Sequence, residues 1–369
     1  MEQDSARRRR WPWVVGGLLV ALLAIGAVAV WLAYRNLDSN ITTIDPTEGL
    51  GDVRPAKENE ALNVLAIGSD TREGANSAVG GDSPGLADTT MVLHLSADNS
   101  WAAGVSIPRD SMVQMPDCVG ADGVVVPGAL RQFNAAYPIG GPACVQRTVE
   151  SLTGLRIDHF VVVDFVGFVD MVDAVGGVTV YIPEPISDPQ SKIYFETGCQ
   201  TLDGKQALDY VRVRKGVGGG DGSDIGRIER QQAFLSALIQ KVTSSGVLFN
   251  PIDLYDFLDA ATRSVTTDPG IGSIRSMASV AVRVRAIGLA SIEFTTVPNE
   301  VYPPDPNRVQ WTQPEADELW AALRADEPLT PRTSPSPSGS PAATSGPATP
   351  SPRPSFGTTR ADQPICPAA

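Results

Sequence analysis

The pattern of hydrophobic and polar positions begins with one long apolar run. Residues 11–34 carry no charge, have tryptophan or tyrosine at both ends, and follow four arginines at 7–10. A helix of this length crosses a hydrocarbon core of ~30 Å and leaves its aromatic residues in the two interfaces. A cleaved signal peptide is the alternative, but its apolar region is only about 7–15 residues long. We therefore predict a transmembrane helix at 11–34, with residues 1–10 in the cytoplasm and the rest of the chain outside it.

A polar spacer at 35–60 separates this helix from a region of short strands and helices. Apolar runs and alternating segments predict strands at 61–68, 89–96, 100–107, 157–165, 178–183 and 207–214. Helical periodicity predicts a helix that ends near 155, one at 166–177 and one from 224 to about 245. This mixture argues for an α/β or α+β fold, with layers around one sheet over residues 61–325. The Pro/Ser/Thr-rich residues 326–369 predict a disordered tail.

The second and third predicted strands form a hairpin around a turn at Asp98 and Asn99. With the turn centred there, position 88 lies opposite positions 108–109. We therefore expect Asp88 and Arg109 at the same end of the hairpin, which places a carboxylate beside a guanidinium group.

The chain carries a formal net charge of −13 at pH 7, yet basic residues gather in one short stretch. Five of them fall within nineteen residues: Arg212, Arg214, Lys215, Arg227 and Arg230. A solvated face with surface ion pairs is the ordinary explanation for such a run, and an anion-binding site is the alternative. Alternation in the segment 207–214 is expected to place Tyr210, Arg212 and Arg214 together on one face of a strand.

The helix predicted from residue 224 favours the anion site. Asp224, Arg227 and Gln231 fall within roughly 60° of one another on its surface, next to the apolar stripe. A solvated face would lie opposite that stripe, and buried charges need a partner. Because helix N-termini also favour anions, the pattern indicates a pocket for a strongly anionic group such as a phosphate. A structural ion-pair network is the alternative.

Carboxylates near this pocket would repel an anion unless a cation lies between them. The candidates are Asp70, Asp88 and Asp224. Mg²⁺ is usually held by one or two carboxylates together with substrate phosphates, so arginines combined with a Mg²⁺–carboxylate pair suit a pyrophosphate. In the alternative explanation, Asp70 caps a turn and Asp88 only begins the hairpin.

The four cysteines fit an exported protein, because disulfides persist in oxidising compartments. Four thiols allow three pairings, which the sequence alone leaves open. We predict that Cys118 pairs with Cys144 and that Cys199 pairs with Cys366. The two histidines lie in apolar segments that are typical of core positions, which argues against a serine–histidine catalytic triad.

Seven ordered motifs resemble those of the LytR-CpsA-Psr family. They are LAIGSDTR (65–72), ADTTMVLHL (87–95), GVSIPRDSMV (104–113), FNAAYPIGGPA (133–143), VDAVGGVTV (172–180), LDGKQALDYVRVR (202–214) and DIGRIERQQ (224–232). The resemblance covers residues 61–245, and the following segment to Leu323 resembles the actinobacterial branch. It implies an α/β/α sandwich around a mixed sheet, with an apolar tunnel for a lipid.

The resemblance implies a membrane-anchored transferase outside the cytoplasm. Such an enzyme moves a glycopolymer from a polyprenyl-pyrophosphate carrier to peptidoglycan and forms a phosphodiester with the muramic acid 6-hydroxyl. The implied partners are the lipid-linked glycopolymer, the peptidoglycan acceptor and the membrane, reached through one helix, and no nucleic acid is expected. Arabinogalactan, teichoic acid and capsule are all candidate polymers, with an actinobacterial wall glycan such as arabinogalactan favoured by the branch.

The resemblance also implies roles for individual residues. Asp70 and Asp88 become the ligands of Mg²⁺ or Mn²⁺, and Asp224 orients the arginines. The pyrophosphate ligands become Arg109, Arg212, Arg214, Arg227 and Gln231, with Arg72 of the first motif as a further candidate. Asp88 or Asp110 could serve as the general base.

The sequence departs from the family pattern at two positions. Leu86 stands where many members carry an arginine, and Gln132 stands where many carry a lysine. A membrane-anchored pyrophosphatase and a non-catalytic regulator or wall-binding anchor are the alternative functions. The pyrophosphatase would use the same site with water as the acceptor. The intact set of aspartates and arginines argues against the regulator, because a binding module has no need of metal-binding carboxylates.

Overall fold

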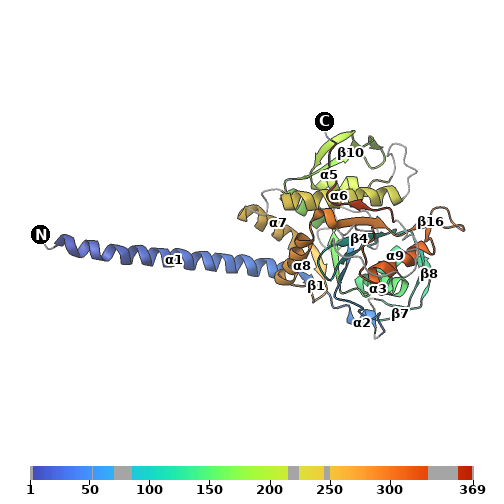
Figure 1. Ribbon diagram of the computed structural model, residues 1–369, viewed down its shortest axis with the longest axis horizontal. Coiled ribbons are helices and arrows are strands. Elements are labelled where there is room, and N and C mark those ends of the chain that lie inside the picture. Colours follow the sequence, from blue (N-terminus) through green and yellow to red (C-terminus); the bar gives the residue numbers. More distant parts are fainter. Residues whose placement is uncertain are drawn as a thin grey trace, which may run out of the picture.

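A computed structural model describes residues 3–51, 53–69, 85–120, 122–214, 224–244, 250–330 and 356–367. Its first element, α1 (Gln3–Asn40), stands out from the rest of the molecule as one long helix (Figure 1). Among the described residues, Val15–Asn40 is the one stretch long and apolar enough to cross a membrane, judged by length and composition. The prediction of a single N-terminal apolar helix is therefore confirmed.

An eight-stranded mixed sheet forms the centre of the domain. Its strands, in spatial order, are β1 (Thr42–Thr43), β14 (Val265–Thr267), β9 (His159–Asp164), β2 (Leu62–Ser69), β3 (Ala87–Leu95), β4 (Ala102–Ile107), β15 (Ile292–Thr296) and β18 (Thr359–Arg360). β2 runs parallel to β9 and antiparallel to β3, whereas β4 runs antiparallel to β3 and parallel to β15. The predicted hairpin is β3–β4.

Helices cover both faces of this sheet (Figure 1). The described helices of the domain are α2 (Thr47–Leu50), α3 (Ala136–Thr153), α4 (Phe165–Ala174), α5 (Gly204–Arg212), α6 (Asp224–Ser244), α7 (Pro251–Arg263), α8 (Ile274–Ile287) and α9 (Glu315–Arg324). Side chains alternate along each strand, so Val92 of β3 packs in the core with α3 and α9, and Met91 packs in the core with α6 and α8. The layers confirm the predicted α/β/α sandwich.

Five two-stranded ribbons extend from the central layers. They are β5 (Met112–Met115) with β8 (Ala129–Gln132), β6 (Cys118–Val119) with β7 (Val125–Val126), β10 (Val178–Ile182) with β13 (Gly198–Leu202), β11 (Ile186–Asp188) with β12 (Ile193–Phe195), and β16 (Asn299–Val301) with β17 (Val309–Trp311). The β10–β13 ribbon packs with α4, α5 and α6 around a separate apolar core.

The predicted strand at 207–214 is wrong. The segment belongs to α5, because Asp203 accepts a hydrogen bond from the Gln206 N–H and the Gln206 side chain accepts one from the Asp203 N–H. This reciprocal pair is a capping box, which nucleates a helix. Tyr210 is consequently buried while Arg212 is exposed, so the two do not share a strand face.

The predicted spacer and tail both belong in part to the folded domain. In the spacer, β1 joins the sheet through β14, and Arg54 forms an ion pair with the buried Glu150. In the tail, β18 pairs with β15, and Ala361 is fully buried. The prediction of disorder is therefore wrong for residues 356–367, while 331–355 lie outside the described residues.

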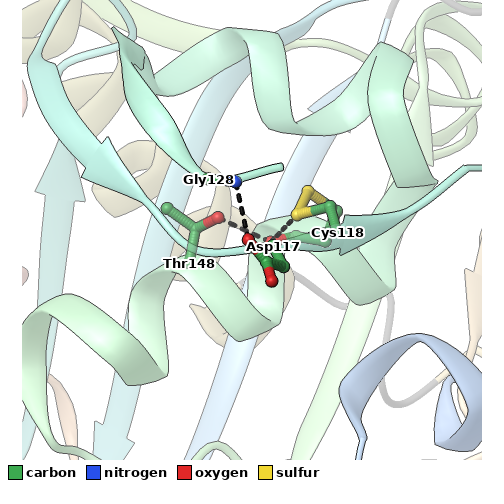
Figure 2. Close-up of a disulfide and its surroundings, with 5 residues drawn as sticks. Asp117, Cys118, Gly128 and Thr148 are labelled. Atoms are coloured by element: carbon green, nitrogen blue, oxygen red, sulfur yellow. Dashed lines mark hydrogen bonds between the residues drawn. A yellow bond between two sulfur atoms is a disulfide. The ribbon is translucent and has the colours of Figure 1, made fainter. Parts of the chain in front are cut away.

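Both predicted disulfides are present. Cys118–Cys144 joins β6 to α3, and Figure 2 shows it beside Thr148 of that helix. Beside the bridge, the Gly128 N–H donates to the Asp117 carboxylate over 2.7 Å (Figure 2). Cys199–Cys366 joins β13 to the end of the chain and so ties the tail to the domain.

Candidate active site

A cluster of charged side chains lies where the β3–β4 hairpin ends. The pairing of Thr90 with Ile107 continues towards Asp88 and Arg109, and the Arg109 guanidinium group donates to the Asp88 carboxylate. The side chains are 15% and 19% exposed, so this pair is mostly shielded from water. The register that the sequence predicted for the hairpin is thus confirmed by the contact at its end.

The first turn of α6 contributes the most deeply buried pair of the cluster. Arg227 and Asp224 are 3% and 6% exposed, and 2.6 Å separates the Arg227 Nη2 and Asp224 Oδ1 atoms. Arg227 also donates to the backbone carbonyl of Asp88 over 2.9 Å, which fixes α6 against the hairpin. The charged first turn therefore faces inward, as the helical periodicity predicted.

Arg109 lies among three carboxylates. Its Nε atom is 3.6 Å from Asp224 and 3.7 Å from Asp110, in addition to the contact with Asp88. Burial by itself lowers the pKa of Arg109, but the attraction of Asp88, Asp224 and Asp110 outweighs burial and raises it. Arg109 is therefore a fixed positive charge at every physiological pH.

Burial moves the pKa values of the α6 pair in opposite directions. It raises the pKa of the Asp224 carboxyl group, against the opposing attraction of Arg227 and Arg109. It lowers the pKa of Arg227 to about 10, despite the attraction of Asp224. Because a pKa of about 10 still leaves Arg227 protonated at neutral pH, the site keeps both guanidinium charges.

Several buried polar atoms of this cluster have no hydrogen-bond partner among the described residues. They are Arg109 Nε, Arg227 Nε, Asp224 Oδ1 and Asp224 Oδ2. Buried polar atoms are normally satisfied, and leaving one unsatisfied costs about 1–3 kcal/mol. The ion pairs of Arg227 and Arg109 with Asp224 balance these charges without completing the hydrogen bonds, so the cluster is a candidate place for a polar ligand.

Asp110 connects a second group of side chains to the cluster. Its carboxylate accepts from Arg214 at 3.3 Å, from Arg308 at 3.4 Å and from Gln132 at 3.0 Å. Gln132 therefore supplies a neutral donor to the same carboxylate. Arg308 was not predicted as a site residue, because it lies between β16 and β17 in a stretch without a local pattern of basic residues.

The structure does not bring every predicted residue into this cluster. The Arg212 guanidinium group stacks over the Phe165 ring, 4.5 Å from its centroid. Gln231 donates to the backbone carbonyl of Val211 over 3.2 Å, so it holds the end of α5 against α6. Arg230 likewise donates to the Val213 carbonyl. Asp70, Arg72 and Lys215 lie outside the described residues.

The family model described as the LytR_cpsA_psr family matches residues 33–325, which include the site and most of the predicted spacer. The chain belongs to the LytR-CpsA-Psr family. This LytR-CpsA-Psr protein is 34% identical to the probable cell wall biosynthesis protein LcpB of Corynebacterium glutamicum, over 87% of this chain and 75% of that protein. The similarity to a corynebacterial protein agrees with the predicted actinobacterial branch.

Other LytR-CpsA-Psr relatives extend the comparison. The chain is 30% identical to the polyisoprenyl-teichoic acid–peptidoglycan teichoic acid transferase TagU of Oceanobacillus iheyensis, over 74% of this chain and 82% of that protein. The crystal structure of B. subtilis TagV superposes with a TM-score of 0.54 at 27% identity, covering 75% of this chain and 100% of that one. The predicted family and fold are therefore confirmed.

Proposed function

We propose that this protein is a phosphotransferase of cell-wall assembly. It transfers a glycopolymer from a polyprenyl-pyrophosphate carrier to the muramic acid 6-hydroxyl of peptidoglycan. Membership of the LytR-CpsA-Psr family and the similarity to TagU, which is named a teichoic acid–peptidoglycan transferase, support the reaction class. Arabinogalactan is the polymer that the resemblance to the actinobacterial branch favours, and teichoic acid, which the name of TagU states, and capsule are the alternatives.

The observation that carries the proposal is the set of buried guanidinium groups at the end of the β3–β4 hairpin. Arg109 and Arg227 keep their charge, and each has a buried Nε atom without a hydrogen-bond partner among the described residues. Arg214 is linked to the same cluster by its ion pair with Asp110. Guanidinium groups bind phosphate oxygens strongly, and in a shielded site they stabilise charge that develops during phosphoryl transfer. Arg212 and Gln231 stay predicted pyrophosphate ligands, although their present contacts are with α4 and α5.

The carboxylates of the cluster are suited to a hard divalent cation. Asp88 lies at the cluster with 19% of its side chain exposed, and both oxygens of Asp224 lack hydrogen-bond partners among the described residues. No group of three or more His, Cys, Asp or Glu side chains is placed for a metal within the described part of the chain. Mg²⁺, however, is usually held by one or two carboxylates plus phosphates and water. We propose that Asp88, together with Asp70, holds Mg²⁺ or Mn²⁺, which would neutralise phosphate charge when bound.

The proposed reaction is a displacement at phosphorus. The muramic acid hydroxyl oxygen forms a bond to the phosphorus atom that carries the glycopolymer, and the bond from that phosphorus to the bridging pyrophosphate oxygen breaks. Polyprenyl phosphate leaves, with its charge stabilised by the arginines. Asp88 or Asp110 is the proposed acceptor of the hydroxyl proton. The rest of the catalysis is positioning, since phosphoryl transfer needs little covalent participation by the protein.

An assay with a labelled lipid-pyrophosphate glycopolymer tests the proposal. The full-length protein in detergent or vesicles is incubated with this donor and Mg²⁺, with and without purified peptidoglycan. We expect label to become attached to peptidoglycan, with polyprenyl phosphate released in equal amount. Release of free phosphorylated polymer at the same rate without peptidoglycan would instead show a pyrophosphatase, and retention of intact donor would show a binding protein.

A further inference from the structure

The apolar helix does not end where its uncharged segment ends. The first charge after that segment is Arg35, and α1 continues without interruption to Asn40. Along these last turns it is bonded to the domain: Asn36 donates to Tyr255 and Asp259 of α7, and Asn40 donates to Asp259 over 2.9 Å. The anchor is therefore joined directly to the folded domain, with no flexible linker between them.

A second helix fixes the same part of α1. The Ile274 N–H at the start of α8 donates to the Asp38 carboxylate over 3.0 Å. Two domain helices thus hold α1 from different directions, and Figure 1 shows α7 and α8 at the point where the long helix meets the domain. Bonds on two sides prevent α1 from swivelling freely relative to the domain.

The hydrogen bonds also set the level of α7 along α1. Asn36 is bonded to residues 255 and 259, and Asn40 is bonded to residues 259 and 262. The residue numbers of the bonded partners rise together along α1 and α7, so these two helices run in the same direction. Asn36 contacts residues 255 and 259 of α7, so it lies level with position 257. Ile252 precedes that position by five residues, which puts it about 7 Å closer to the membrane at ~1.5 Å per residue. This places the first turn of α7 level with Trp31.

Trp31 marks the expected membrane–water interface. It belongs to the aromatic end of the uncharged segment, where tryptophan and tyrosine favour the headgroup layer. Ile252 has 70% of its surface exposed at that level, and Arg275, next to the α8 residue bonded to α1, is also exposed. An exposed isoleucine and an exposed arginine are suited to acyl-chain ends and lipid phosphates, respectively.

We propose that the first turn of α7, led by Ile252, and Arg275 of α8 form a membrane-contact surface beside α1. The bilayer surface is the partner, because this surface is continuous with the anchor and lies at the height of its interface. Only about 7.5 Å of helix separates Arg35 from Asn40, and the headgroup layer is itself about 5–8 Å thick on each side. The domain therefore has no room to stand clear of the membrane.

Two acidic residues limit the depth of this contact. Asp253 and Asp256 are exposed on α7 beside Ile252, and carboxylates are costly to place in hydrocarbon. The first turn of α7 therefore rests in the headgroup layer and does not enter the acyl core. The inference rests on the membrane anchoring predicted for α1, whose stretch Val15–Asn40 is long and apolar enough to span a bilayer.

Single-cysteine labelling in the full-length protein tests this contact. The four native cysteines are all paired in disulfides, so an introduced cysteine is a unique labelling site. Ile252→Cys is labelled with a fluorophore and reconstituted in vesicles of phosphatidylcholine and phosphatidylglycerol that contain lipids spin-labelled on the headgroup. We expect strong quenching at position 252, close to that of Trp31→Cys, and weaker quenching by lipids labelled deep in the acyl chain.

Two further positions complete the test. Val301→Cys on β16 is the matched control, because Val301 is 58% exposed and β16 lies on the side of the domain away from α1 (Figure 1). Leu23→Cys reports on the anchor and is expected to be quenched by the deep label. Quenching at 252 that is no stronger than at 301, while position 23 is quenched, would overturn the membrane contact and leave the anchor intact. Absence of quenching at 23 would overturn the anchoring as well.

Discussion

At the scale of single residues, the candidate site combines groups that stabilise the fold poorly and bind anions well. Arg227 and Asp224 form a buried ion pair in which several polar atoms lack hydrogen-bond partners among the described residues, and burial shifts the pKa of each towards its neutral form. Natural proteins keep such groups where a ligand uses them. The buried carboxylate of Asp268 behaves in the opposite way, because its pKa is lowered.

Asp268 lies far from the arginine cluster, between β14 and β9, and is predicted to make stability depend on pH. Burial tends to raise its pKa, but hydrogen bonds from His159 and from the Gly270 and Phe160 N–H groups outweigh burial and lower it below 3.8. A lowered folded-state pKa gives stability that is present above pH 3.8 and lost as the pH falls through the folded-state value.

The change Asp268→Asn tests this linkage. The variant is expected to melt at a lower temperature than the wild type at pH 7, and the difference should shrink as the pH falls below 3.8. Thermal unfolding followed by circular dichroism between pH 7 and pH 3 measures it. An unchanged difference across that range would mean that the ionised carboxylate contributes nothing to the stability of the fold.

Asp88 is predicted to determine the metal requirement. Chelation should abolish transfer, and Mg²⁺ or Mn²⁺ should restore it. Asp88→Asn should raise the Mg²⁺ concentration for half-maximal transfer by about 10-fold or more, because a ligand charge is lost. The matched control is Asp209→Asn, which removes a carboxylate from an exposed ion pair with Lys205. If the two variants depended equally on the Mg²⁺ concentration, Asp88 would not be a metal ligand.

At the scale of helices and strands, the end of the chain is an integral part of the sandwich. β18 extends the central sheet beyond β15, and Gln240 of α6 donates to the Ala361 carbonyl over 2.6 Å. Ala361 is fully buried with Ile292 and Phe294. A segment with these contacts should contribute to folding although it follows a long Pro/Ser/Thr-rich stretch.

Ala361→Asp should therefore destabilise the domain. A carboxylate at this fully buried position costs about 3 kcal/mol or more, which corresponds to roughly 6–12 °C in Tm for a domain of this size. Arg360→Ala, at the exposed neighbouring position, should leave Tm nearly unchanged. Calorimetry of the two variants measures the difference, and equal melting temperatures would mean that the tail end is dispensable.

The sequence predicted those parts of the fold that depend on local patterns. The β3–β4 register followed from one turn, and the inward position of Arg227 followed from helical periodicity. The strand predicted at 207–214 is wrong because the capping box at Asp203 favours a helix more strongly than the alternation of the five residues 210–214 favours a strand. Arg308 could not be predicted, because it is far from Asp110 in the sequence. The two residues meet only in the folded domain, where their neighbours Val309 and Ser111 form a β-bridge.

At the scale of the whole molecule, one apolar helix carries a disulfide-bonded domain. Two disulfides fit an oxidising compartment, and the arginines at 7–10 fit the cytoplasmic side of the membrane. In the proposed orientation, the candidate site lies on the same side of the membrane as peptidoglycan, and a lipid carrier would reach it from the outer leaflet.

Protease treatment of intact protoplasts checks this orientation. An externally added protease should remove the domain and leave a short membrane fragment that contains the N-terminal arginines, detected through an N-terminal tag. A cytoplasmic marker protein in the same cells should stay intact. Protection of the domain, with loss of the N-terminal tag, would reverse the topology.

The central claim is that the arginine cluster drives transfer to peptidoglycan, and Arg214 is its most accessible member. Its side chain is 39% exposed, so Arg214→Ala should fold normally. The direct measurement is the rate of label transfer from lipid-pyrophosphate donor to peptidoglycan by wild type, Arg214→Ala, Arg214→Lys and the surface control Lys205→Ala. We expect both Arg214 variants to lose on the order of 10²–10³ in rate, since even lysine lacks the bidentate fork, with Lys205→Ala unchanged. Full transfer by folded Arg214→Ala would contradict this claim. It would mean that the charged side chains of the cluster form a structural ion-pair network and do not bind the pyrophosphate.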